Sequence, residues 1–188
     1  MNQPKRKRIR LPEYDYSTPG AYFVTICTEN RRCILSTITV GAAISRLPDT
    51  APSDGLTPTT AVGAAISRPP DKAPVIVLTR YGEIVKQAIE QIPGIYPQIS
   101  IDCYVIMPNH IHLILRIDTD ADGRLIAAPT VSTVIGQMKR WASKTCGVAI
   151  WQKSFHEHII RREADYRQIW DYIDTNPAKW AEDCYYTP

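Results

Sequence analysis

The stretch ISIDCYVIMPNHIHLILRI (residues 99–117) decides the fold. It contains two alternating runs, Ile99 to Met107 and Ile111 to Ile117, joined by Pro108-Asn109, a pattern typical of an antiparallel hairpin. Residues two apart in a strand project from the same face. One face of the second run carries only isoleucine and leucine, so we expect it to pack on helices, while His110 and His112 share the other face.

The segments around this hairpin predict the rest of an α+β fold. An earlier strand is expected at 21–27, bounded by Pro19-Gly20, with a short partner strand at 33–35. Periodic apolar positions predict helices at 79–92, with Thr79 as N-cap, at 131–145 and at 163–175, and 155–160 reads as a short extended piece. Helices interleaved with antiparallel strands indicate one antiparallel sheet with helices packed on one face, for which a ferredoxin-like fold is the obvious candidate.

The chain contains an internal duplication between the first strands and the first helix. The segment VGAAISRLPDTAP (40–52) recurs as VGAAISRPPDKAP (62–74). Two copies are too few for a solenoid, and both are too rich in Pro, Gly, Ser and Thr to build a core. We therefore predict a single domain over 11–188 in which residues 40–75 form a flexible loop insertion, which costs little in loop-closure entropy.

The overall composition is ordinary for one globular domain, but the charge is unevenly placed. The chain has 188 residues, 44% of them hydrophobic, and a formal net charge of +3. A basic N-terminal arm over residues 1–10 carries Lys5, Arg6, Lys7, Arg8 and Arg10. Such an arm either keeps the protein soluble or contacts nucleic acid, since basic clusters attract polyanions.

The cysteines and the hydropathy pattern bear on where the protein works. The five cysteines form no C-x-x-C pair and are odd in number, which argues against a disulfide framework and for a reducing compartment. The N-terminus lacks an apolar stretch, and no run approaches the roughly 18 apolar residues of a membrane span. We therefore expect a cytoplasmic protein with no membrane partner.

His110 and His112 are the first candidates for chemistry. Two imidazoles side by side on a rigid strand supply the first two ligands of a divalent metal in an open site. The alternative is that they are two solvated or hydrogen-bonded histidines on an exposed sheet face. The same spacing in His156 and His158 shows how easily the pattern arises.

The last predicted helix offers a tyrosine to a polar site. Tyr166, Ile169, Trp170 and Ile173 make its apolar stripe, whereas Tyr172 falls on the polar stripe with Asn176. A tyrosine in this position is either half-buried between helix and sheet or available as a nucleophile. Asn176 either caps the turn after Pro177 or places an amide oxygen near a metal.

Three sequence blocks together resemble a known family. YVIMPNHIHLIL (104–115) resembles the HUH motif block of single-tyrosine transposases, in the branch called REP-associated tyrosine transposases, after repetitive extragenic palindromes. The C-terminal blocks 151–161 and 171–177 and the N-terminal pieces 22–25 and 30–32 are similar to that branch as well. The resemblance covers most of the chain outside the basic arm and the duplicated segment, which departs from the family's compact shape.

The resemblance implies a fold, an activity and roles for particular residues. The family has a ferredoxin-like or RRM-like sheet and cuts and rejoins single-stranded DNA beside hairpins, through a 5′-phosphotyrosine intermediate and with Mg²⁺ or Mn²⁺. It implies that His110 and His112 bind the metal, that Asn176 is its amide-type ligand and that Tyr172 is the nucleophile. The alternatives are a protein that binds DNA hairpins without cutting them and a metal-dependent hydrolase that uses water.

The remaining expectations concern contacts with DNA and the assembly. Phosphate contacts are expected from the basic arm and from Lys139, Arg140, Lys144 and Arg161, of which Arg161 matches a family position. His158 matches another family position, and we expect it to support the site or touch DNA. Relatives work as monomers or homodimers, and the sequence leaves both open.

Overall fold

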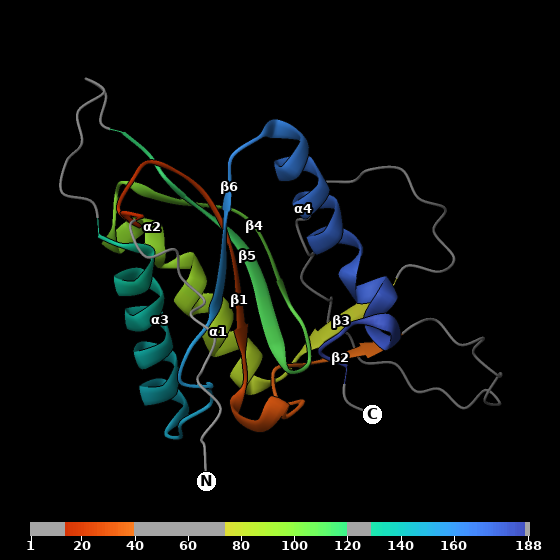
Figure 1. The fold of residues 1–188 in the computed structure, drawn as a ribbon. Coiled ribbons are helices and arrows are strands. Elements are labelled where there is room, and N and C mark those ends of the chain that lie inside the picture. The colour runs from red at the N-terminus through yellow and green to blue at the C-terminus, as the bar shows by residue number, and fades with distance from the viewer. Residues whose placement is uncertain (1–13, 40–73, 120–128, 187–188) are drawn as a thin grey trace, which may run out of the picture.

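The computed structural model describes residues 14–39, 74–119 and 129–186. Four strands form an antiparallel sheet in the order β4–β5–β1–β6, namely β1 (Gly20–Cys27), β4 (Ile99–Ile106), β5 (His110–Ile117) and β6 (His156–Ile160). With α1 (Arg80–Glu90) between β1 and β4 and α3 (Val131–Cys146) between β5 and β6, these strands follow a β-α-β-β-α-β course. This confirms the ferredoxin-like antiparallel sheet predicted from the sequence (Figure 1).

The helices divide between the two faces of the sheet. α1 and α3 pack together on one face, against the apolar residues of β1 and β5, as the alternation in the hairpin predicts. α4 (Glu163–Thr175), whose bounds agree with the prediction, lies on the opposite face (Figure 1). Its stripe packs there on Val105, Met107 and Ile114, so the last helix joins the face that also carries His110 and His112. The prediction that the helices pack on one face of the sheet therefore holds for α1 and α3 but not for α4.

Local signals set the ends of the helices. Thr79 caps α1, and its side chain accepts a hydrogen bond from the backbone of Gly82. The described residues also include three short helices: η1 (Glu29–Arg31), α2 (Ile92–Ile95) and η2 (Asn176–Glu182). Pro93 lies inside α2, in its first turn, where proline is tolerated. Among the described residues, no helix has both the length and the apolar character needed to cross a membrane.

In the sequence, the duplicated segment lies between two short strands. β2 (Ser36–Thr39) and β3 (Val75–Leu78) pair antiparallel, with Thr39 opposite Val75. The partner strand expected at 33–35 is therefore wrong in position and in pairing, since β2 starts at Ser36 and binds β3, not β1. The two strands are far apart in sequence, so no local pattern shows their pairing. Residues 40–73 of the predicted insertion and the basic arm lie outside the described residues, and Val75 belongs to β3.

A glycine in the first turn of α1 provides a test of this packing. A Cβ atom on Gly82 would overlap the carbonyl oxygen of Leu35, which belongs to the segment leading into β2. We expect Gly82→Ala to lower the free energy of unfolding by about 3 kcal/mol, because backbone must move to make room. Gly136→Ala in α3, where the space is open, should instead raise it by roughly 0.5–1 kcal/mol. Urea denaturation measures both, and equal effects would contradict the packing at Leu35.

Candidate active site

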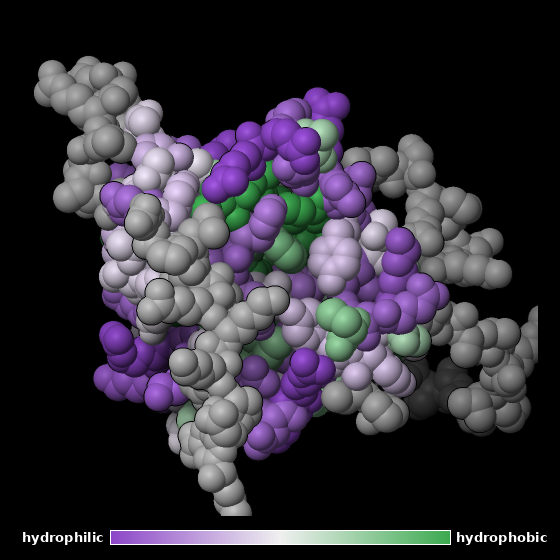
Figure 2. Space-filling view, in the orientation of Figure 1, coloured by the Kyte–Doolittle hydropathy of each residue, from purple (hydrophilic) through white to green (hydrophobic). Residues whose placement is uncertain are grey.

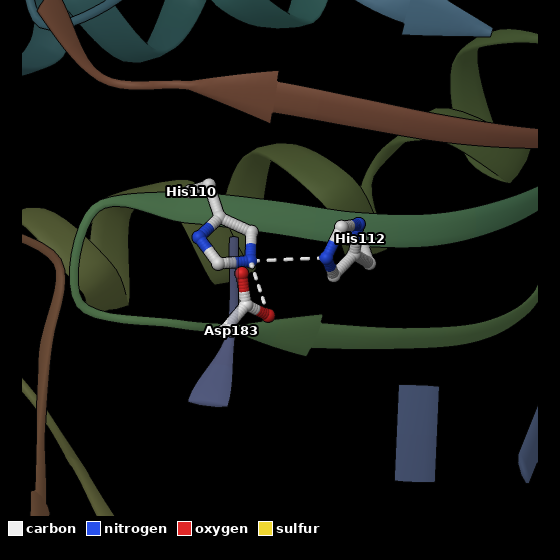
Figure 3. Close-up of side chains that lie close together, drawn as sticks. All are labelled: His110, His112 and Asp183. Atoms are coloured by element: carbon white, nitrogen blue, oxygen red, sulfur yellow. Dashed lines mark hydrogen bonds and ion pairs between the residues drawn. The ribbon is translucent and has the colours of Figure 1, made fainter. Parts of the chain in front are cut away.

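His110 and His112 meet on the α4 side of the sheet. Both imidazoles come from β5 and are buried, with exposed fractions of 0% and 1%. Their Nε2 atoms lie 3.0 Å apart (Figure 3). Strand alternation explains the shared face, and the burial excludes the alternative of two solvated histidines.

The outer ring nitrogen of each histidine has its own partner. His110 Nδ1 lies 2.8 Å from Asn109 Oδ1, and His112 Nδ1 lies 2.8 Å from the hydroxyl of Thr25 on β1. The Asn109 amide nitrogen donates to Tyr185 O, so its oxygen must accept from His110 Nδ1–H, which leaves a lone pair on His110 Nε2. The Thr25 hydroxyl oxygen can likewise accept a hydrogen bond from His112 Nδ1–H. Such outer partners orient metal-binding histidines in proteins.

Asp183 brings a carboxylate to the same point. It follows η2, and its Oδ2 atom lies 4.0 Å from His110 Nε2 (Figure 3). One ligand atom from each of His110, His112 and Asp183 lies within 4.8 Å of the others. Imidazole nitrogens and a carboxylate oxygen are common ligands of divalent metals, and His110, His112 and Asp183 could each supply one. The residues present therefore fit a divalent cation.

Burial keeps the two imidazoles neutral. It lowers the pKa of His110 to about 4, with the Asp183 charge opposing the shift and Arg31 adding to it. Burial, and then the neighbouring His110, lower the pKa of His112 well below its usual range. Neutral imidazoles are the form that binds a metal, so the site stays ready for one in mildly acidic solution.

These shifts predict how stability depends on pH. A histidine whose pKa is lowered in the folded state contributes stability that is complete above about pH 6.5 and is lost as the pH falls. For His110 alone the free energy of unfolding should drop by about 2 kcal/mol between about pH 7.5 and about pH 5, measured by urea denaturation of metal-free protein. His110→Asn should flatten this dependence, whereas the exposed His156→Ala should keep it. An unchanged slope in His110→Asn would argue against a buried neutral imidazole.

Tyr172 projects from α4 toward the histidines. Its hydroxyl lies 3.3 Å from His112 Nε2 and 3.4 Å from Asp183 Oδ2, while the residue as a whole is 40% exposed. The ring packs edge-on against Phe23, which stacks on His112. Burial, followed by the Asp183 charge, raises the pKa of the Tyr172 phenol, which is therefore neutral at pH 7. The structure thus brings Tyr172, His110 and His112 together.

Asn176 lies one turn beyond Tyr172 and is 2% exposed. Its Nδ2 atom donates to Asp183 Oδ2 at 2.6 Å, and its side chain caps neither adjoining helix. Its Oδ1 atom is buried without a hydrogen-bond partner in the described part of the chain. The amide therefore touches the site through Asp183.

The basic residues expected to contact DNA are spread out. Lys139 is half-buried and donates to the carbonyl oxygens of Gln152, Lys153 and Ser154, so in this structure it holds the loop before β6. Arg140 and Lys144 are exposed residues of α3, whereas Tyr172 belongs to α4. These two helices lie on opposite sides of the sheet (Figure 1). Arg161 is exposed between β6 and α4.

The second histidine pair faces the same side of the sheet as the first. His156 lies opposite Thr25, which lies opposite His112, so two strand spacings, about 10 Å, separate the two histidines. His158 lies opposite Phe23. α4 lies mainly over β4, and both histidines on the edge strand β6 are exposed. Figure 2 shows hydrophobic surface beside α4, rimmed by hydrophilic side chains.

Sequence reasoning missed the C-terminal half of the site. Asp183 and Tyr185 follow the last predicted element, and Tyr185 packs on His110 with ring centroids 4.7 Å apart. The Arg31 guanidinium lies 5.3 Å from the Tyr185 ring centre. Arg31 has a left-handed backbone with φ 53°, as does Asn30 with φ 55°. The run Asp183-Cys-Tyr-Tyr186 was the available signal in the sequence. Its contacts with His110 on β5 join distant segments, so no local sequence pattern predicts them.

Comparison with known proteins identifies relatives of this chain. No family model matches the chain. A protein of Haemophilus influenzae described as uncharacterized is 30% identical over 200 residues, covering 96% of this chain and 93% of that protein. The REP-associated tyrosine transposase of Escherichia coli is 32% identical over 104 residues, covering 55% of this chain and 58% of that protein.

A solved structure agrees with the fold. It is described as a REP-associated tyrosine transposase bound to a REP hairpin, and it matches with a TM-score of 0.55 and 24% identity over 90% of this chain and 74% of that one. A second Haemophilus influenzae protein, described as a putative REP-associated tyrosine transposase, is 31% identical over 113 residues, covering 54% of this chain and 62% of that protein. The chain is therefore similar to REP-associated tyrosine transposases over about half of its length, and it spans less than two thirds of the relatives that carry this description.

Proposed function

We propose that this protein is a metal-dependent HUH endonuclease and transposase that cuts and rejoins single-stranded DNA through a 5′-phosphotyrosine. One observation carries the proposal: the Tyr172 hydroxyl lies 3.3 Å from His112 Nε2, beside paired neutral imidazoles and a carboxylate. A helical tyrosine at a two-histidine site can attack a phosphate whose charge a bound cation offsets.

The covalent step follows from the position of Tyr172. Mg²⁺ or Mn²⁺ held by His110 and His112 would withdraw negative charge from a non-bridging phosphate oxygen. The Tyr172 oxygen forms a bond to phosphorus as the bond from phosphorus to the 3′ oxygen breaks. The 3′ oxygen keeps the electron pair and takes up a proton, and the phenol proton passes to solvent water, which reaches this partly exposed residue. A second 3′-hydroxyl reverses these bond changes and joins the strands.

The raised pKa of Tyr172 supports the need for a cation. Burial and the Asp183 carboxylate both disfavour a phenolate, so the side chains alone leave the nucleophile protonated. Positive charge beside His112 and Asp183 would reverse this electrostatic balance. Hard divalent ions with open coordination positions, such as Mg²⁺ and Mn²⁺, suit a phosphate ligand.

The proposed substrate is single-stranded DNA next to a hairpin. The E. coli relative is named for REP sequences, and the similar solved structure is bound to a REP hairpin. The scissile strand must be unpaired, because a duplex would keep its phosphate from the half-buried phenol. We propose that Arg161, which is exposed directly after the edge strand β6, contacts phosphate, and that Arg140, Lys144 and the basic arm also bind DNA. Lys139 is left out, because its ammonium group is bound to carbonyl oxygens.

The test is a labelled DNA hairpin with a single-stranded flank, incubated with the protein and Mg²⁺ or Mn²⁺. A protein–DNA adduct stable in denaturing gels supports the transposase. Cleavage without an adduct would point to a hydrolase, and binding without cleavage to a hairpin-binding protein. Sedimentation of the same samples decides between monomer and homodimer.

A further inference from the structure

We propose that Asp183, in the segment after η2, is the anionic ligand of the metal at this site, and that Asn176 orients its carboxylate. The inference rests on the proposed function, because it completes the same metal site. It differs from the ligand set that the family resemblance implies, in which Asn176 binds the metal.

The charge around Asp183 is the first argument. Its side chain is 1% exposed, so its carboxylate is almost completely removed from water. Its Oδ2 atom lies 4.0 Å from His110 Nε2, the nitrogen that also faces His112. A carboxylate that is removed from water is stabilised when a cation lies against it. A divalent ion between Asp183 and the imidazoles would supply that charge.

The hydrogen bonds around the carboxylate are the second argument. Asn176 Nδ2 donates to Oδ2 at 2.6 Å, and the Tyr185 backbone N–H donates to Oδ1 at 2.7 Å. Both oxygens are thereby oriented, as the carboxylate ligands of metals commonly are. The same bond turns the nitrogen of the Asn176 amide, not its oxygen, toward the ligand cluster. Asn176 is thus a positioning residue.

The docking of the C-terminal segment explains how Asp183 reaches the site. The Tyr185 ring packs on His110, and the Tyr185 carbonyl accepts a hydrogen bond from Asn109 Nδ2 at 2.8 Å. Asn109 therefore holds His110 through its oxygen and the C-terminal segment through its nitrogen. The ligands from β5 and from the C-terminal segment are positioned by one side chain.

The ligand chemistry agrees with these contacts. A carboxylate binds Mg²⁺ or Mn²⁺ more strongly than a neutral amide oxygen does, because these hard ions prefer anionic oxygen. Two imidazoles and one carboxylate leave further coordination positions for water and for a phosphate oxygen. The Tyr172 hydroxyl, 3.4 Å from Asp183 Oδ2, lies beside those positions.

Calorimetric titration of the protein with Mn²⁺ alone, without DNA, tests the inference. We expect Asp183→Asn to weaken Mn²⁺ binding by about 100-fold or more and Asn176→Ala by about 10-fold, the usual range for an outer partner. Glu182→Gln, which removes an exposed carboxylate from the neighbouring position, should bind Mn²⁺ like the natural protein. Circular dichroism confirms folding, and Asp183→Glu provides a second variant with the charge retained but displaced.

Each outcome is decisive. Equal Mn²⁺ affinity in the natural protein and Asp183→Asn would overturn the role of Asp183 and leave the two-histidine proposal standing. A larger loss in Asn176→Ala than in Asp183→Asn would make Asn176 the ligand and overturn the inference as well. A natural protein that binds no Mn²⁺ would overturn both the inference and the metal dependence of the proposed function.

Discussion

Replacing Tyr172 with phenylalanine is expected to abolish the protein–DNA adduct and to lower strand cleavage by about 10⁴-fold or more. The change removes only the hydroxyl that lies 3.3 Å from His112 Nε2. The ring contacts with Phe23 and His112 remain, so the fold and DNA affinity should stay close to those of the natural protein. Denaturing gels with end-labelled DNA measure the adduct and the cleaved strand together.

The matched control is Tyr186→Phe, which removes a hydroxyl from another exposed tyrosine of the C-terminal region. It should form the adduct at the natural rate. An adduct that persists in Tyr172→Phe would exclude Tyr172 as the nucleophile. Loss of the adduct in Tyr186→Phe alone would identify Tyr186 as the nucleophile. Cleavage that continues without any adduct would support hydrolysis by water.

Replacing His110 or His112 with alanine should lower cleavage by about 10³-fold or more, because each change removes one of two imidazoles facing a common point. The loss should persist at high Mn²⁺ concentration. His156→Ala, with the same sequence spacing but about 10 Å from His112, should retain cleavage within about twofold. Single-turnover cleavage at saturating DNA makes the comparison.

Stability must be measured alongside, because both histidines are buried. Removing His112 takes away its hydrogen bond with the Thr25 hydroxyl, and removing His110 takes away its hydrogen bond with Asn109 Oδ1. Replacement by glutamine in place of alanine retains much of the packing. A folded variant of His110 or His112 that cuts DNA normally would show that the pair is not needed for cleavage. Loss of cleavage in His156→Ala alone would assign the metal-binding role to the histidines of β6.

Local patterns account for the parts of this structure that were predicted correctly. The alternation in residues 99–117 indicates both strands and the face of each side chain, because the period of a strand is two. The stripes of α4 separate Tyr166 from Tyr172 for the same reason, with a period of 3.6. Thr79 indicates the start of α1 because its hydroxyl satisfies a backbone N–H at the helix end.

The parts that were missed depend on contacts between distant segments. β2 and β3 pair across the duplicated segment, and neither strand is long enough to show a pattern of its own. The charge of Lys139 is evident from the sequence, whereas the carbonyl oxygens that bind its ammonium group are brought together only by the loop before β6.

The sequence by itself determined the β-α-β-β-α-β order, the shared face of His110 and His112 and the polar placement of Tyr172, since these follow from periods of two and 3.6 residues. Only the tertiary structure decided that α4 covers the histidine face and that Asp183 and Tyr185 close the site. The physical reason is that the Asp183 carboxylate meets the His110 and His112 imidazoles only after the chain has folded, because Asp183 is far from them in sequence. Strand and helix periodicity describe only residues that are close in sequence.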